Sequence, residues 1–208
     1  MILERIEVGE LQVNCYVLAE GKGSAAAIID PGQDEDEIRK ILAKYSLKPE
    51  VVINTHGHID HIGCDDRFGV PIYVHQEDLK LLHDPQANLS TFLMSPYSID
   101  KSVKIETVQE KDIINVGNLV LKVIHTPGHT PGGICLLLES GNDKILFTGD
   151  SLFYRSVGRT DFPGASEKIL IKAIKEKLFK LPGDTIVYPG HGPSSTIADE
   201  IKNNPFLK

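Results

Sequence analysis

The sequence of 208 residues contains no tryptophan, only three cysteines and no long apolar run. A membrane-spanning helix needs about 20 consecutive apolar residues, so we expect no membrane span. Cys15, Cys64 and Cys135 are odd in number, far apart and outside any C-x-x-C motif. This pattern disfavours a disulfide framework and favours free thiols in a reducing cytoplasm.

Positive charge is also scarce, because 22 Lys and Arg residues face 29 Asp and Glu residues and the formal net charge is −7. Nucleic-acid binding needs a clustered cationic surface, which this sequence lacks. The N-terminus has no basic segment followed by an apolar one, so no secretory signal is indicated. We therefore expect a cytoplasmic protein acting on a small molecule, as a monomer or small homo-oligomer.

Predicted strands and helices alternate along a chain whose length favours a single domain, residues 1–208. Strands are expected at Ile2–Val8, Leu11–Leu18, Ala25–Ile29, Val51–Ile53, Pro71–Val74, Leu119–Ile124, Ile134–Leu138, Ile145–Phe147 and Ile186–Tyr188. Helices are expected at 34–45, Gln76–His83, Ala165–Leu181 and Thr196–Lys202. Residues 84–104 have no clear periodicity and are expected to form a surface excursion that could cover a site. The pattern indicates an α/β sandwich of mixed sheets.

The histidines of the sequence have an unusual arrangement. Four segments each place an apolar strand directly before a glycine-containing turn that carries His or Asp. The candidate residues are His56, His58, Asp60 and His61 in the first segment, then His129, Asp150 and His191. Ligands of α/β proteins bind at such strand ends. Imidazole and carboxylate are good ligands for zinc and other divalent first-row metals.

The spacing of the first segment favours two metal ions rather than one. A single ion does not easily take four ligands from so tight a turn. His56 and His58 can bind one ion, and Asp60 and His61 can bind the next, which leaves three downstream ligands to complete the sites. Three histidines fall outside this pattern. We expect His75 and His83 at the surface or at helix caps, and His125 in a structural role or as a residue that orients a ligand.

These motifs resemble those of the metallo-β-lactamase superfamily. Within it the sequence is most similar to glyoxalase II, the hydroxyacylglutathione hydrolases, over essentially the whole chain. The supporting stretches are residues 55–61, 126–133, 147–153, 158–164 and 188–194. The resemblance implies the metallo-β-lactamase fold, an αββα sandwich of two mixed β-sheets flanked by helices, with a metal site at one edge.

The resemblance also implies a ligand set for two divalent metal ions. The first ion would be held by His56, His58 and His129, the second by Asp60, His61 and His191, and Asp150 would bridge them. Zinc is the metal we expect first, with iron or manganese as alternatives. His58 separates the chain from the flavodiiron oxygen reductases, which carry Glu at that position.

The implied reaction is attack of a metal-bridging hydroxide on a thioester such as S-lactoylglutathione, with Asp60 and Asp150 as catalytic residues. A thiolate leaves without help from a general acid. Arg159 would bind a carboxylate of the glutathione portion, or else pair with Asp161 at the surface. Tyr154 is expected to contact the substrate, with packing in the core as its other role.

Two departures from glyoxalase II leave an alternative open. We expect the chain to lack the C-terminal helical region that supplies much of the glutathione site in that group, and Gly133 stands where His is more common. It is therefore expected to belong to a short glyoxalase II-like subgroup. Residues 158–162 also resemble the persulfide dioxygenases, which oxidise glutathione persulfide with a single iron held by two His and an Asp. A metal-binding protein without enzymatic activity is the third possibility.

Overall fold

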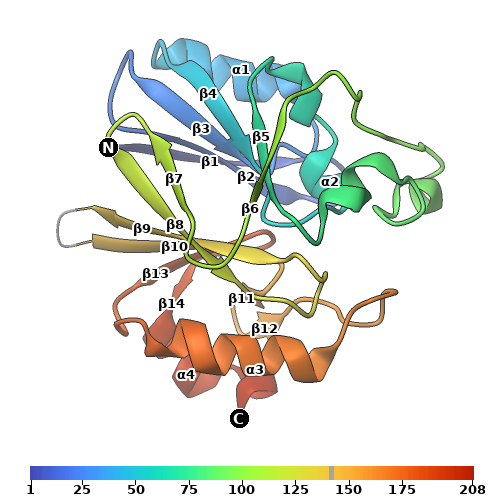
Figure 1. The fold of residues 1–208 in the computed structure, drawn as a ribbon. Coiled ribbons are helices and arrows are strands. Elements are labelled where there is room, and N and C mark those ends of the chain that lie inside the picture. The colour runs from blue at the N-terminus through green and yellow to red at the C-terminus, as the bar shows by residue number, and fades with distance from the viewer. Residues whose placement is uncertain (141–142) are drawn as a thin grey trace.

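Two mixed six-stranded sheets face each other at the centre of the structure (Figure 1). The computed structural model describes residues 1–140 and 143–208. The first sheet has the order β1 (Ile2–Val8), β2 (Val13–Ala19), β3 (Ala25–Ile29), β4 (Lys48–Ile53), β5 (Ile72–His75), β6 (Ile105–Val108). The second has the order β14 (Ser195–Thr196), β13 (Ile186–Pro189), β10 (Asp143–Gly149), β9 (Ile134–Ser140), β8 (Leu119–His125), β7 (Ile113–Val116). A small hairpin pairs β11 (Leu152–Phe153) with β12 (Ser156–Val157).

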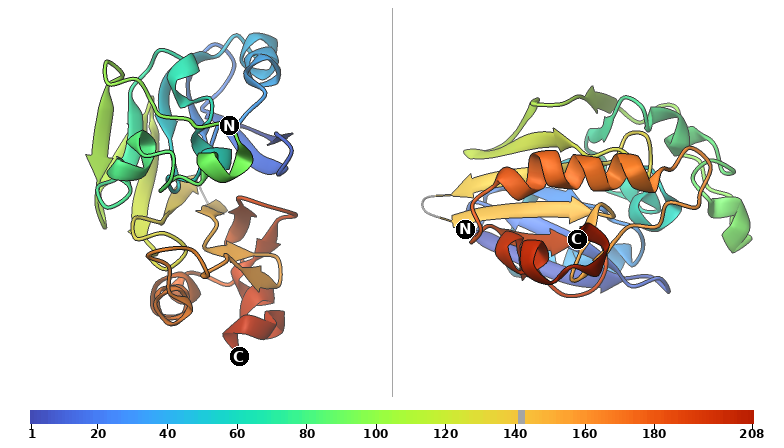
Figure 2. Two further views of the ribbon diagram at one scale, coloured as in Figure 1. Left: turned by 90° about the vertical axis from the view of Figure 1, so that its right-hand side faces the viewer. Right: turned by 90° about the horizontal axis from the view of Figure 1, so that it is seen from below.

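Helices cover the two outer faces of this sandwich (Figures 1 and 2). Helix α1 (Glu35–Lys44) packs Ile38 and Leu42 against the first sheet. Helices α3 (Glu167–Lys177) and α4 (Ile197–Asn203) pack Leu170 and Ile197 against the second. The predicted αββα sandwich is confirmed. None of the described helices has the length and hydropathy to cross a membrane.

The remaining helical elements are short. Helix α2 (Ile59–Ile62) follows β4, and the 3₁₀ helices are η1 (Asp65–Arg67), η2 (Leu79–His83), η3 (Ser90–Leu93), η4 (Leu178–Lys180) and η5 (Pro205–Leu207). Asn88 and Ser90 are buried at the base of η3, so the excursion predicted at 84–104 is anchored.

Strand β2 shows how the sequence fills both sides of a sheet. Tyr16 and Leu18 point into the cluster between the sheets, and Cys15 and Val17 point into the cluster under α1. Side chains alternate between the faces of a strand, so a strand covered on both faces is apolar throughout. Each such large side chain stabilises the fold by about 1.5–3 kcal/mol. Cys15 and Cys135 are buried, and all three cysteines are free.

The structure differs from the sequence expectation in several short elements. The predicted helix at 76–83 is only the 3₁₀ helix η2, because the carboxylate of Asp78 is fixed by other parts of the chain and holds the preceding residues in a turn. Strands β6, β7, β11, β12 and β14 were not predicted, since runs of two to four residues carry too little periodicity. The long predicted helix at 165–181 divides into α3 and η4.

The expectation of a surface position for His75 is wrong. His75 ends β5, is only 2% exposed, and stacks on His125, which ends β8 in the other sheet. The two ring centroids are 3.9 Å apart with planes 16° from parallel. The Nε2–H group of His125 donates to the carbonyl of Pro131 at 2.9 Å. Burial and the neighbouring His125 lower the pKa of His75 to about 4, so the imidazole of His75 is neutral near pH 7.

This stack predicts a pH-dependent stability. The pKa of His75 is lower in the folded chain than its ordinary value of 6.5. Its stabilising contribution is therefore complete above that value and is lost as the pH falls toward 4. Between about pH 7.5 and 5 the free energy of unfolding should fall by roughly 2 kcal/mol through this group. Urea unfolding of His75→Phe should show a pH dependence weaker by that amount, whereas His83→Phe should match the wild type. Equal pH dependence in all three proteins would contradict this account.

Candidate metal centre

The predicted ligands gather at the edge where strands of both sheets end. His56 follows β4 of the first sheet, whereas His129, Asp150 and His191 follow β8, β10 and β13 of the second. His58, Asp60 and His61 lie at the start of α2 and within it. The structure thus brings together all seven side chains from four strand ends.

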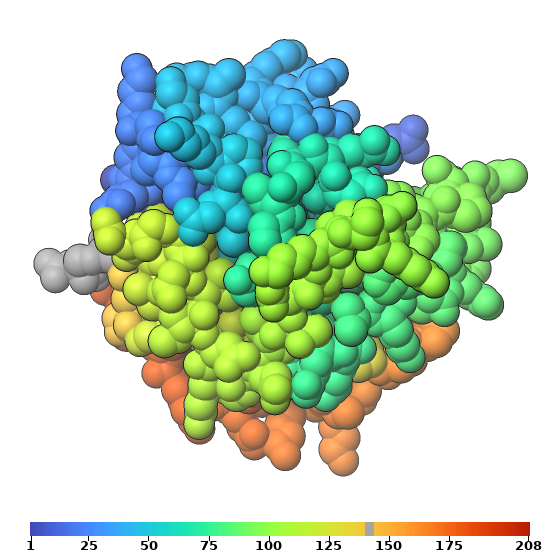
Figure 3. All heavy atoms as spheres, turned by 45° about the horizontal axis from the view of Figure 1, so that its top comes forward, coloured from blue at the N-terminus to red at the C-terminus, as the bar shows by residue number. Residues whose placement is uncertain are grey.

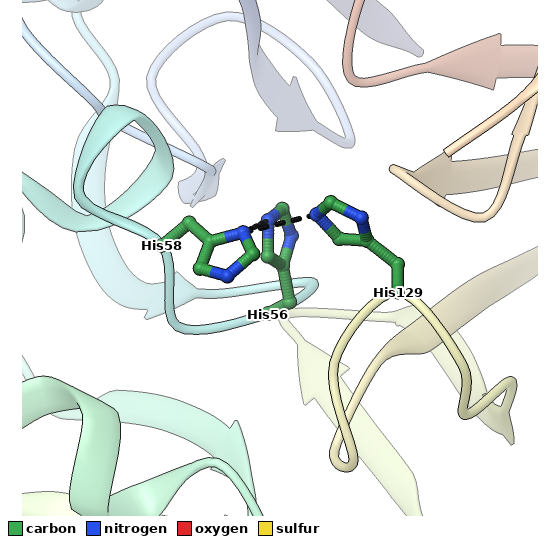
Figure 4. Close-up of side chains that lie close together, drawn as sticks. All are labelled: His56, His58 and His129. Carbon is green, nitrogen blue, oxygen red and sulfur yellow. Dashed lines mark hydrogen bonds between the residues drawn. The ribbon is translucent and has the colours of Figure 1, made fainter. Parts of the chain in front are cut away.

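The first cluster consists of His56, His58 and His129 (Figure 4). The Nδ1 atom of His58 lies 3.1 Å from Nε2 of His56 and 2.9 Å from Nε2 of His129. The three ring planes are 80–87° apart, so each ring turns one nitrogen toward a common point. An imidazole nitrogen binds zinc at about 2.0–2.1 Å, and these converging nitrogens fit three positions around one ion.

The second cluster consists of Asp60, His61 and His191, whose ligand atoms lie within 4.8 Å of one another. Asp60 Oδ2 is 3.4 Å from Nε2 of His191 and 3.8 Å from Nε2 of His61. This cluster mixes carboxylate and imidazole, a donor set suited to zinc, iron or manganese.

Asp150 lies between the two clusters. Its Oδ2 atom is 3.6 Å from Nε2 of His129 and 3.7 Å from Nε2 of His191. Its Oδ1 atom is 3.4 Å from Nε2 of His61. Oδ1 of Asp150 and Nε2 of His61 are both buried without a hydrogen-bond partner among the described residues. An unpaired buried polar atom costs about 1–3 kcal/mol, so these atoms fit a shared metal better than a metal-free core.

Burial and charge give the two clusters different protonation. Burial and the surrounding imidazoles lower the pKa of His56 well below its ordinary value, and burial with His129 lowers that of His58 to about 3. These imidazoles are therefore neutral ligands at pH 7. Burial also opposes charge on His61, but Asp30, Asp60 and Asp150 outweigh it and raise the pKa of His61 well above the usual range. The same negative field favours a cation at the second cluster.

Asp30 supports both clusters and was not predicted from the sequence. This buried residue directly follows β3, and its Oδ2 atom lies 3.0 Å from Nδ1 of His61. It also accepts hydrogen bonds from the backbone N–H and the hydroxyl of Thr55, at 2.8 and 2.7 Å. The same hydroxyl lies 3.3 Å from Nδ1 of His56. An acidic partner of this kind fixes the orientation of the ring. The sequence carried a signal for it, since Asp30 also stands between an apolar strand and a glycine turn.

Asp78 joins the two loops that carry the first cluster. Its buried carboxylate accepts hydrogen bonds from the N–H of Gly57 at 3.0 Å, the hydroxyl of Thr130 at 2.7 Å and the N–H of Gly132 at 2.7 Å. Gly57 separates His56 from His58, and Thr130 follows His129. Asp78 therefore fixes the distance between the two loops through their backbones. No sequence spacing pointed to this residue, because its partners are 21 to 54 positions away.

Gly190 lets the last ligand loop approach the centre. A Cβ atom at this position would lie 2.4 Å from Oδ1 of Asp150 and 2.8 Å from Cε1 of His61. Any side chain here would displace Asp150 and His61. The glycine before His191 is therefore required by the close packing of the site.

A cavity of about 450 Å³ opens onto both clusters. It is lined by Leu11, His58, Ile59, Asp60, Leu89, Phe92, Leu93, His129, Asp150, Phe153, Arg159, Phe162 and His191. Arg159 is thus at the cavity, and its carbonyl accepts a hydrogen bond from Nδ1 of His129 at 2.7 Å. Tyr154 is not among the described residues that line it, and its ring is 42% exposed beneath the guanidinium of Arg155.

Relatives with similar sequences extend over the whole chain. An uncharacterized protein of Mycobacterium tuberculosis is 42% identical, covering 100% of this chain and 98% of its own. The hydroxyacylglutathione hydrolase GloC of Haemophilus influenzae is 35% identical, with the same coverage of the two chains.

Solved structures are also similar to this chain over nearly its whole length. The B3 metallo-beta-lactamase BLEG-1 matches with a TM-score of 0.89 and 36% identity, over 99% of both chains. TTHA1623 in a di-iron-bound form matches with a TM-score of 0.82 and 33% identity, over 98% of this chain and 100% of its own. The sequence pattern of the metallo-beta-lactamase superfamily matches residues 8–191, a span that contains all seven candidate ligands. The chain belongs to the metallo-beta-lactamase superfamily.

Proposed function

We propose that this protein is a binuclear metal-dependent hydrolase of thioesters, S-lactoylglutathione among them. One observation carries the proposal: the carboxylate of Asp150 lies between two complete three-residue clusters at the floor of one cavity. Two divalent ions in such a pair supply a hydroxide at neutral pH and polarise a carbonyl oxygen. His56, His58 and His129 would hold the first ion, and Asp60, His61 and His191 the second. Asp150 would contact both.

The chain's own residues prepare this centre for reaction. The carbonyl of Arg159 accepts the Nδ1 proton of His129, which leaves Nε2 facing the first cluster. The carboxylate of Asp30 lies 3.0 Å from Nδ1 of His61 and faces it as a negative charge. Ligand side chains whose positions are fixed before the substrate binds need no reorganisation during the reaction.

The leaving group decides between thioesters and amides. A thiolate departs without a proton, whereas the amine released from a β-lactam needs one. The ionisable side chains described around the cavity are the candidate ligands and Arg159, which is always protonated. This lining suits a thiolate and supports the activity in the name of the Haemophilus influenzae relative over that in the name of BLEG-1.

The second candidate function is that of a persulfide dioxygenase, an enzyme that uses one iron. It would need only a site of two His and an Asp. The convergence of Asp60, His61 and His191 into a second cluster supports the binuclear hydrolase.

Metal content and substrate turnover test the proposed function together. Protein loaded with zinc, manganese or iron should bind close to two ions per chain and hydrolyse S-lactoylglutathione, with little activity on a cephalosporin. His58→Ala should lose the first ion and at least a hundredfold in kcat/KM. Oxygen uptake with glutathione persulfide by the iron-loaded protein, together with one ion per chain, would replace this proposal by the dioxygenase. Activity in His58→Ala equal to that of the wild type would rule out both the hydrolase and the dioxygenase.

Asp78→Asn tests the support of the first cluster. The amide can accept fewer of the three hydrogen bonds and turns an NH₂ group toward backbone donors. We expect affinity for the first ion to fall by about 10–100-fold, as for other residues that support ligands, while the second ion is retained. Competitive titration with a chelating dye measures both affinities. The exposed Asp100→Asn is the control and should bind like the wild type. Loss of both ions in equal measure would contradict a role confined to the first cluster.

A further inference from the structure

Apolar side chains form most of the cavity wall beyond the candidate ligands. We call this set the apolar wall: Leu11, Leu89, Phe92, Leu93, Phe153 and Phe162. Phe92 is 74% exposed, and Leu11 and Leu93 are each 50% exposed. Apolar residues gathered on a surface in this way usually mark a binding site.

The apolar wall reaches the centre from two sides. The ring of Phe162 has its centroid 5.3 Å from that of His58 and 6.0 Å from that of His129. The ring of Phe153 is 5.9 Å from that of His191. A group attached to a carbonyl at the centre would therefore meet an aromatic ring at either cluster.

The exposed part of the wall is held in place by buried polar contacts. The side chain of Asn88 donates to the carbonyl of Tyr97 at 2.9 Å, and its Oδ1 atom accepts from the N–H of Ser90 at 3.0 Å. The carbonyl of Asn88 accepts from the N–H of Ile59 at 2.9 Å, at the start of the helix that carries Asp60. These contacts fix η3 with Phe92 and Leu93 facing solvent. Figure 3 shows the surrounding segment, in green, projecting at the side of the molecule.

Beyond the candidate ligands, the charge of the described cavity lining is that of Arg159, which is paired with Asp161. Arg159 is the one Lys or Arg among the described residues of the lining, and it pairs with both oxygens of Asp161 at 3.0 and 2.8 Å. Its guanidinium also lies 4.6 Å from the ring centroid of Phe162. The six side chains of the apolar wall carry no charge themselves, and the exposed Arg159–Asp161 pair lies beside them. The wall is therefore suited to an uncharged group.

We propose that the apolar wall binds the acyl group of the substrate, and that the preferred thioesters carry apolar acyl chains rather than small hydroxyacyl groups. This inference rests on the proposed thioesterase function and names its substrate class. Burying one methylene group is worth about a fourfold change in affinity, from about 0.8 kcal/mol per CH₂. Specificity along an acyl series should follow that increment until the wall is filled.

The test compares acyl thioesters of one uncharged thiol, N-acetylcysteamine, on metal-loaded protein. From acetyl to butanoyl to hexanoyl, kcat/KM should rise about fourfold per methylene, and lactoyl should fall below butanoyl. Phe92→Ala should flatten the rise along the series, with the largest loss of kcat/KM for hexanoyl. Phe206 lies outside the cavity and is 48% exposed, so Phe206→Ala is the matched control. This variant should keep the full slope.

A binding series keeps the inference testable if no thioester is hydrolysed. Acetate, butanoate and hexanoate are the acid products of the same series, and calorimetry gives their affinities for the metal-loaded protein. Affinity that rises with chain length, and rises less in Phe92→Ala, supports the apolar wall even if the thioesterase proposal fails. Affinities and rates that stay flat with chain length, or a Phe92→Ala effect equal for every chain, would overturn it.

Discussion

The burial of Asp150 between two groups of imidazoles is the constraint on which this structure depends. A carboxylate withdrawn from water costs several kcal/mol unless charge and hydrogen bonds compensate it. Within the described residues its Oδ1 atom has no hydrogen-bond partner, and His61 lies beside it with its own buried Nε2 unpaired. A cation bound between these two groups would compensate both of them. The metal centre explains why these groups are tolerated.

The same constraint accounts for the architecture around the centre. Ligands on strand ends of two separate sheets must meet within a few ångströms, so the sheets need a fixed spacing. The apolar cluster between them supplies it at the core, and the stacked pair His75 and His125 does so where β5 and β8 end. Asp78 then sets the separation of two ligand loops, and Gly190 lets a third approach. Rigid elements and supporting hydrogen bonds together give a site its precision.

Much of the fold and the candidate ligand set could be predicted from the sequence, because both rest on local patterns. Apolar strands before glycine turns marked the strand ends, and His56 through His61 marked a metal-ligating turn. The αββα arrangement and the family followed from the resemblance. Asp78 and the burial of His75 could not be found in this way. Asp78 acts on backbone groups up to 54 positions distant, and His75 is buried by a partner from the other sheet. Such contacts arise only when the chain is folded.

The lining of the cavity describes the substrate-binding space, which the motif alone does not. The motif assigns a family and a kind of chemistry, whereas Phe92, Phe153 and Phe162 describe the space a substrate would occupy. The sequence left two roles open for Arg159, binding of a substrate carboxylate or pairing with Asp161 at the surface. In the fold it is paired with Asp161, and it is its carbonyl that contacts the candidate ligand His129.

The central claim is that two metal ions share Asp150. Crystals of the metal-loaded protein, measured at the absorption edge of the bound metal, test it most directly. The account predicts two anomalous peaks about 3.5–4 Å apart, one among His56, His58 and His129 and the other beside His61, with the carboxylate of Asp150 between them. A single peak at the three histidines, with Asp60 and His191 turned away from any metal, would contradict it.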